Sequence, residues 1–126
     1  DRLYAFAFTW GVSSGLDSLS IIKFETYLSG LFSPTDLPRG SIYDSYISFK
    51  NKPDGEWMPW SEDIQKFEFD KTKSYFDLVV QTKDTVRYSW LLKTNVEFLN
   101  SVFFTGVTGV GKTIIMKAAL GEMKNE

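Results

Sequence analysis

The chain has neither cysteine nor histidine among its 126 residues. Without cysteine, the sequence excludes disulfide frameworks and zinc sites built on thiolates. Without histidine, it also excludes histidine-based general-base catalysis and most transition-metal sites. A reducing compartment is compatible with the absence of cysteine but is not demonstrated by it.

The sequence also has little net charge and no long apolar run. Its formal net charge is −2, so no basic field points to nucleic acid or to an anionic membrane surface. No segment approaches the roughly 20 apolar residues that a membrane-spanning helix needs. The chain opens with Asp1, without a basic leader or a cleavage pattern, and we expect it to be an internal piece of a longer protein.

Aromatic residues, in contrast, are abundant. They make up 17% of the chain, with 11 Phe, 6 Tyr and 4 Trp. So many rings in a small chain suggest surfaces that other parts of a larger structure cover. The hydrophobic share of 43% and the charged share of 24% are ordinary for a soluble globular protein.

The first 31 residues predict two helices joined by a turn. The run RLYAFAFTWGV is apolar nearly all round, which favours a buried helix over a strand, and Gly11 followed by SSG ends it. Asp17 or Ser18 caps a second helix, which Gly30 and the following SPTDLP end. Its apolar residues fall at helical spacing: Ile21, Phe24, Tyr27, Leu28 and Leu31.

Residues 37–77 read as short strands separated by turns. SIYDSYISF and KFEFD are strand-like, and KPDG is a turn in which glycine accepts a left-handed backbone. Trp57 and Trp60 flank Pro59. We expect these rings to pack an ordered connector onto its own core, rather than to mark a partner site.

From Leu78 onward the pattern becomes α/β. LVVQT predicts a short strand, and Thr82 or Asp84 caps a helix that runs to about Leu99 and closes at Asn100. VFFTG then predicts a buried strand, and TIIMKAALGEM a further helix. The apolar stripe expected on the earlier helix consists of Val86, Trp90, Leu91, Thr94 and Phe98.

Between that strand and that helix, GVTGVGKT fits the phosphate-loop pattern G-x-x-x-x-G-K-[ST]. Glycine lets successive backbone N–H groups converge on phosphate oxygens, and the following helix turns its positive end to the same anion. Lys112 adds a full charge, and the Thr113 hydroxyl is the expected Mg²⁺ ligand. The candidate phosphate-binding residues are Gly106, Val107, Thr108, Gly109, Val110, Gly111, Lys112 and Thr113.

Hydrolysis requires parts that this stretch does not contain. A second acidic strand must hold Mg²⁺ and polarise water, and a polar sensor and an arginine finger usually assist. After Thr113 the only carboxylates are Glu122 and Glu126, both toward the outer end of the last helix. We therefore predict weak nucleotide binding without turnover and assign no catalytic residue.

Other readings of the same residues remain open. The loop could belong to a different P-loop enzyme, such as a kinase or a transporter ATPase, or to a structural scaffold that keeps its nucleotide or has none. Arg87, three residues from Asp84 and four from Lys83, is more often part of a solvated pair on a helix than a functional residue.

Three stretches together resemble one family. EWMPW, VVQTKDTVRYSWLL and VFFTGVTGVGKT, in this order, look like the dynein heavy chain where its second AAA+ module ends and its third begins. The resemblance covers nearly the whole chain. It implies the helical lid of the earlier module in residues 1–50. It also implies a connector and the start of the next large α/β subdomain, with its phosphate loop, in residues 51–126.

The resemblance also implies a site and partners. ATP or ADP with Mg²⁺ would be the ligand, and the backbone from Val80 to Thr82 would border the adenine. Gln81 departs from the family, which usually has proline there. The implied function is ATP binding in a regulatory module of a motor. Its partners would be the rest of the AAA+ ring, microtubules, and intermediate and light chains, with no nucleic acid and no membrane. The amino-acid sequence of the loop is more similar to that of axonemal inner-arm chains, which implies cilia or flagella.

Overall fold

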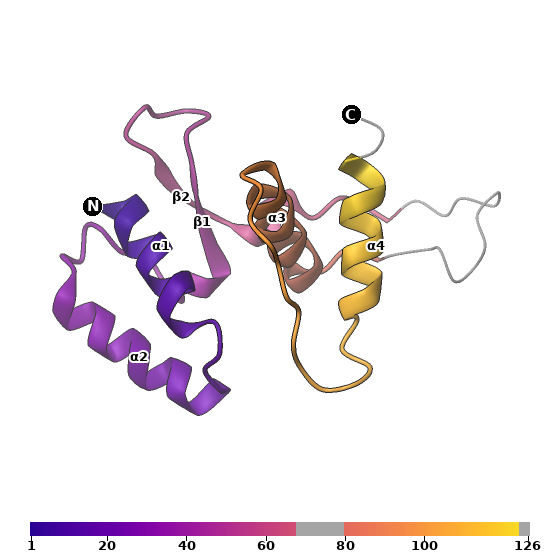
Figure 1. Ribbon diagram of the computed structural model, residues 1–126. Helices are drawn as coiled ribbons and strands as arrows, with labels where there is room; N and C mark the ends of the chain where they lie inside the picture. Colours follow the sequence, from indigo (N-terminus) through magenta and orange to yellow (C-terminus); the bar gives the residue numbers. More distant parts are fainter. Residues whose placement is uncertain (68–79, 124–126) are drawn as a thin grey trace. The chain divides into compact units, whose positions relative to one another are not determined.

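The computed structural model describes residues 1–67 and 80–123 (Figure 1). It divides the chain into two compact units, Asp1–Glu62 and Asp63–Glu126, and each unit is treated by itself. The predicted strand KFEFD lies outside the described residues from its third residue on, and LVVQT lies outside them in its first two residues. In the described parts of both stretches no strand is formed.

The first unit begins with α1 (Arg2–Ser13) and α2 (Ser18–Leu31) (Figure 1). Asp17 caps α2, because its Oδ1 accepts hydrogen bonds from the backbone N–H groups of Leu19 and Ser20 at 3.0 and 2.8 Å. The hydrogen bond from Ser20 contributes most to lowering the pKa of the Asp17 carboxyl below its usual value. Both helices end close to the predicted stops: α1 ends at Ser13, in the SSG that follows Gly11, and α2 ends at Leu31, one residue after Gly30 and before SPTDLP.

The core of this unit lies between the two helices and the segment after them. Ala5, Leu28, Ile42 and Tyr43 form its buried centre. The rings of Phe8 and Phe24 stack across the helix pair with centroids 6.2 Å apart.

Burial is less complete than the sequence predicts. In α1 only one face is buried, and Leu3, Tyr4 and Val12 are exposed. In α2 the predicted stripe is covered at Leu28, but Tyr27 and Leu31 remain more than half exposed.

A two-stranded antiparallel sheet completes the unit. The 3-10 turn η1 (Ile42–Asp44) leads into β1 (Ser45–Ser48), which pairs with β2 (Glu56–Pro59), and the 3-10 turn η2 (Trp60–Asp63) follows. The KPDG turn joins the strands: the Gly55 N–H donates to the Lys52 carbonyl oxygen at 3.0 Å, and Gly55 has a φ of +74°. The sequence predicted β1 only in part, since the first residues of SIYDSYISF form η1, and it missed β2.

Two indole rings fasten this hairpin to the helical part of the same unit. Trp60 is completely buried, stacks on Tyr46 with centroids 4.6 Å apart, and donates from Nε1 to the Tyr43 carbonyl oxygen at 3.1 Å. Trp57 donates from Nε1 to the Asp36 carbonyl oxygen at 3.1 Å, and its ring lies 6.3 Å from that of Phe6.

Both rings therefore contact residues of their own unit: Trp57 meets Phe6 and Asp36, and Trp60 meets Tyr43 and Tyr46. The compact unit consequently runs to Glu62. The predicted division between residues 50 and 51 concerns modules of a larger protein and stays a prediction.

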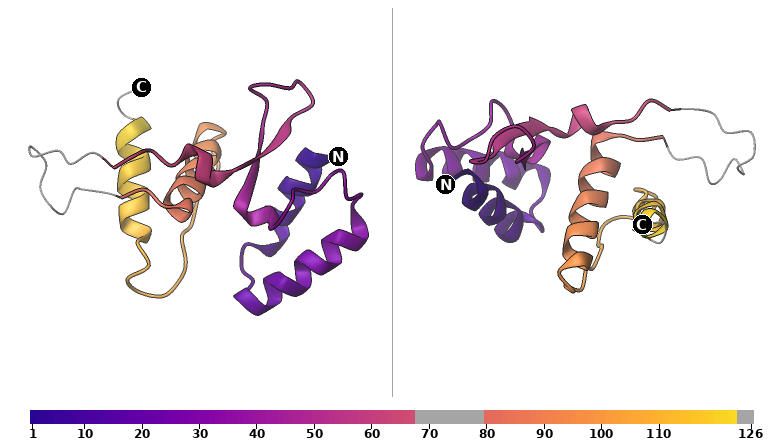
Figure 2. Two further views of the ribbon diagram at one scale, coloured as in Figure 1. Left: turned by 180° about the vertical axis from the view of Figure 1, so that it is seen from behind. Right: turned by 90° about the horizontal axis from the view of Figure 1, so that it is seen from above.

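The second unit contains α3 (Lys83–Glu97) and α4 (Lys112–Met123), which cross each other (Figure 2). Their buried residues are Leu92 on α3 and Ile115 and Ala119 on α4. Leu92 is not part of the predicted apolar stripe. Two members of that stripe, Trp90 and Phe98, are 37% and 74% exposed. Among all described residues, no helix combines the length and the apolar character that crossing a membrane requires.

The buried strand predicted for VFFTG is wrong. Residues 101–107 form no strand, and Phe103 is 90% exposed. A strand is maintained by pairing its N–H and C=O groups with a neighbour. Within residues 63–67 and 80–123 no neighbouring strand is described, so the segment runs as an extended arc from α3 to α4 (Figure 1).

The hairpin turn generates the first prediction, for Gly55→Ala. A Cβ at this position would lie 2.6 Å from Ile47 Cγ2 and 3.0 Å from Phe49 Cε1, on a backbone that side chains rarely adopt. We expect a loss of about 1–3 kcal/mol in the free energy of unfolding, measured by urea unfolding followed by tryptophan fluorescence.

Gly15→Ala is the matched control. A Cβ at Gly15 meets nothing within 4 Å, so its effect should stay within about 0.5 kcal/mol. Equal effects of the two substitutions would show that the close approach at Gly55 does not exist.

Candidate phosphate-binding loop

All three glycines of the motif have a positive backbone φ. Gly106, Gly109 and Gly111 have φ values of +146°, +88° and +84°. A Cβ would meet no atom within 4 Å at Gly109 or Gly111, and only an ordinary contact with Val110 at Gly106. Glycine is therefore required here by backbone conformation and not by crowding. The open space beside the loop leaves its backbone accessible to a ligand.

The Lys112 side chain folds back over this loop. Its Nζ donates to the carbonyl oxygens of Gly106 and Val107 at 3.0 and 2.6 Å. These two hydrogen bonds join the ammonium group to the first two residues of the loop. The charge predicted to meet phosphate is thus held against carbonyl groups of the loop.

The helix after the loop starts where the sequence predicts. α4 begins at Lys112, and its first internal hydrogen bond joins the Ile115 N–H to the Gly111 carbonyl oxygen at 3.0 Å. The N–H groups of Lys112, Thr113 and Ile114 precede this bond and have no acceptor inside the helix. Together with the positive end of the helix dipole they make the loop a suitable place for an anion. Thr113 is exposed in this first turn.

The sequence did not predict an aromatic contact at Phe104, in the segment that leads into the loop. The ring of Tyr88 on α3 meets Phe104 edge to face, with centroids 6.3 Å apart. The Arg87 guanidinium lies 4.9 Å from the Tyr88 centroid and pairs with Asp84 Oδ1 at 2.8 Å. The paired role expected for Arg87 is present. The order of the aromatic residues around the loop is the only signal in the sequence that could indicate the Tyr88–Phe104 contact.

The residues predicted to border adenine are positioned by α3 and not by the loop. Thr82 is the N-cap of α3: its Oγ1 accepts from the Thr85 N–H at 3.3 Å, and its own N–H donates to Thr85 Oγ1 at 2.7 Å. Val80 is 59% exposed. Gln81 accepts a hydrogen bond from the Gln65 N–H at 2.8 Å through its side chain.

The end of α3 carries an unusual residue. Leu99 has a φ of +59° and is 94% exposed. Its N–H donates to the Val96 carbonyl oxygen and the Asn100 N–H to that of Asn95, both at 2.9 Å. This is the paired hydrogen bonding of a Schellman helix end, in which glycine normally occupies the position of Leu99.

Acidic side chains near the loop are few. Glu122, near the far end of α4, forms an ion pair with Lys93 on α3, which holds the two helices together at that end. Within residues 1–67 and 80–123 no three carboxylates or other ligands group in a way that could hold a metal ion.

Almost the whole chain matches known protein families. Residues 1–62 match the family described as dynein heavy chain AAA lid domain, and residues 67–126 match the P-loop containing dynein motor region. The chain belongs to the dynein heavy chain family. This membership rules out the alternative of a kinase or transporter ATPase, and the two matched regions are consistent with an AAA+ fold.

Individual dynein heavy chains support the same assignment. The chain is 30% identical over 127 residues to "Dynein axonemal heavy chain 6" of Homo sapiens, covering 98% of this chain and 3% of that protein. It is 30% identical to "Dynein axonemal heavy chain 5" of Rattus norvegicus, covering 99% and 4%. It is 25% identical to "Dynein alpha chain, flagellar outer arm" of Chlamydomonas reinhardtii, covering 100% and 3%.

The chain thus spans only a few per cent of the length of these dynein relatives. No solved structure matches it. The preference for an inner-arm chain stays a prediction, as do the individual phosphate-binding and adenine-bordering residues.

The strained end of α3 gives the second prediction, for Leu99→Gly. Glycine adopts the left-handed conformation without the penalty of a side chain, so Leu99→Gly should be about 1 kcal/mol more stable than Leu99→Ala. Exchange of the Asn100 amide hydrogen, whose N–H donates to the Asn95 carbonyl oxygen, should slow accordingly. Because the Leu99 side chain is 94% exposed, loss of apolar contacts cannot mask the effect. Faster exchange in the glycine variant than in the alanine variant would contradict the assignment.

Proposed function

We propose that residues 106–113 bind the phosphates of ATP or ADP in a regulatory AAA+ module of a dynein motor. The observation that carries the proposal is the loop itself: three glycines at positive φ and the Lys112 ammonium bonded to the Gly106 and Val107 carbonyl oxygens, with the start of α4 next to it. Lys112 would neutralise phosphate charge, and Thr113 would contact Mg²⁺. Bound Mg²⁺ would itself neutralise part of the triphosphate charge.

Binding requires the Lys112 side chain to exchange partners. Its Nζ now donates to two carbonyl oxygens of the loop, and a phosphate would take over part of this donor capacity. A phosphate oxygen is a stronger, charged acceptor than a carbonyl, so the exchange favours binding. The gain is reduced by the two hydrogen bonds given up, which is one reason to expect weak affinity.

The adenine side of the site would be the backbone from Val80 to Thr82. Thr82 is fixed by its cap on α3, and Gln81 is tied to Gln65, so this backbone has a defined course. We propose that the chain alone does not hydrolyse ATP. Beyond Thr113 the only described carboxylate is Glu122, which is engaged with Lys93.

For the whole protein, we propose a microtubule motor of the ciliary or flagellar axoneme. Several matched relatives carry "axonemal" or "flagellar" in their names, and the dynein family supports a ring of AAA+ modules. The nucleotide state of this module would shift the ring between geometries and so change microtubule release at a distance. The rest of the ring, microtubules, and intermediate and light chains are the partners in this proposal.

The third prediction tests the loop by titrating the chain with Mg²⁺–ATP in a calorimeter. We expect weak binding, with a dissociation constant of roughly 1 mM, or about 4 kcal/mol, and no release of phosphate. Lys112→Ala should weaken binding at least tenfold, because a charge-assisted hydrogen bond contributes roughly 1.5–3 kcal/mol.

Lys117→Ala is the matched control, since it removes the same charge from the exposed surface of the same helix. It should bind ATP like the unchanged chain. Equal losses in the two variants would indicate nonspecific attraction and refute a phosphate-binding loop. Absence of binding in a chain that circular dichroism shows to be folded would favour a structural scaffold instead.

A further inference from the structure

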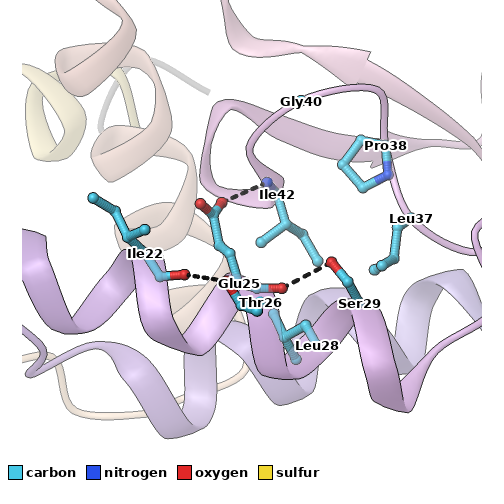
Figure 3. Close-up of a pocket in the computed structure, with 9 residues that line it drawn as sticks. All are labelled: Ile22, Glu25, Thr26, Leu28, Ser29, Leu37, Pro38, Gly40 and Ile42. Atoms are coloured by element: carbon cyan, nitrogen blue, oxygen red, sulfur yellow. Dashed lines mark hydrogen bonds between the residues drawn. The ribbon is translucent and has the colours of Figure 1, made fainter.

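A cavity of about 360 Å³ lies in the first unit, between α2 and the segment from Leu37 to Ile42 (Figure 3). Its volume falls in the range of roughly 300–1,000 Å³ that is typical of sites for small ligands. Its lining residues come from α2 and from this segment alone, so the cavity is independent of the phosphate-binding loop.

A fixed carboxylate lines this cavity. Glu25 Oε1 accepts hydrogen bonds from the Ser41 hydroxyl at 2.5 Å and from the Ile42 N–H at 3.2 Å. Figure 3 shows the Glu25 side chain reaching from α2 toward Ile42. In the described part of the chain, no hydrogen bond is directed at the second oxygen, Oε2. One oxygen therefore orients the carboxylate, and the other keeps its full capacity to accept.

The remaining polar side chains of the lining are acceptors as well. The Thr26 hydroxyl donates to the Ile22 carbonyl oxygen at 3.0 Å, and the Ser29 hydroxyl donates to that of Glu25 at 2.9 Å. Each hydroxyl has only one proton, which the helix backbone has taken. Toward a ligand, Thr26 and Ser29 can therefore only accept.

The rest of the lining is apolar. Ile22, Leu28, Leu37 and Ile42 supply aliphatic side chains, and Pro38 has no N–H group to donate. The cavity thus offers one negative charge and several acceptors, with aliphatic surface beside them. A complementary ligand is a cation rich in donors on an aliphatic stem.

We propose that this cavity is a docking site for an arginine side chain carried by another polypeptide segment. The guanidinium has five N–H donors and no acceptor, which matches a lining whose polar side chains only accept. Its three methylene groups pack against aliphatic side chains while the charged end meets Glu25. Arg39, between the lining residues Pro38 and Gly40, forms no ion pair among the described residues and does not occupy Glu25.

The test is a nuclear magnetic resonance titration of the 126-residue chain with N-acetyl-arginine amide. The control probe is N-acetyl-citrulline amide, which has nearly the same shape but no charge. We expect saturable shifts of the Gly40 and Ile42 amide signals with the arginine probe, and at least roughly fivefold weaker binding of the citrulline probe. This comparison uses the unchanged chain, so it does not depend on how any variant folds.

Two variants sharpen the test. Glu25→Gln keeps an oxygen that can accept from Ser41 and Ile42 but removes the charge, and it should weaken binding of the arginine probe at least fivefold, by about 1 kcal/mol. Arg39→Gln removes a neighbouring positive charge and should leave binding equal or stronger. Both variants should retain the signals of the Trp60 indole, which is buried away from the cavity lining.

Three results would overturn the proposal. The first is no saturable shift at Gly40 and Ile42, and the second is equal binding of the arginine and citrulline probes. The third is a shift of the same signals with protein concentration alone, which would show that a second copy of the chain covers this surface.

Discussion

Left-handed backbone at glycine is the constraint on which both units of this chain depend. In the first unit, Gly55 at a φ of +74° turns β1 back onto β2, and only then can Trp57 and Trp60 reach the carbonyl groups that they bind. In the second unit, Gly106, Gly109 and Gly111 turn the chain around the Lys112 ammonium. Leu99, at a φ of +59°, shows that another residue is tolerated where the side chain is exposed and the helix end supplies hydrogen bonds.

The two units differ in how their backbone groups are satisfied. The first pairs its own strands, and the indole N–H groups of Trp57 and Trp60 bind carbonyl oxygens of Asp36 and Tyr43. In the second, helices provide the internal hydrogen bonds, while the segment from Val102 to Phe104 forms no strand. Apolar side chains such as Phe103 are exposed there. The candidate phosphate-binding loop has a defined conformation, which depends on local glycines and the start of α4.

Local signals in the sequence predicted local features well. The caps at Asp17 and Thr82 and the start of α4 at Lys112 each depend on a few neighbouring residues, and the structure has all three. Features that need distant partners were missed or wrong. β2 follows a turn and ends in proline, so its sequence pattern indicates a connector. Only the structure reveals that it pairs with β1. The contact of Tyr88 with Phe104 and the carboxylate of Glu25 in its cavity likewise depend on tertiary packing, which spacing along the chain does not reveal.

In our proposal, a nucleotide binds this dynein chain at residues 106–113. The most direct measurement is to map the amide signals of the whole chain by nuclear magnetic resonance while Mg²⁺–ADP is added. We expect saturable shifts at Gly109, Gly111 and Lys112, with the first unit unchanged. Shifts confined to residues 1–62, or an unmoved loop at nucleotide concentrations of roughly 10 mM, well above the expected dissociation constant, would contradict it.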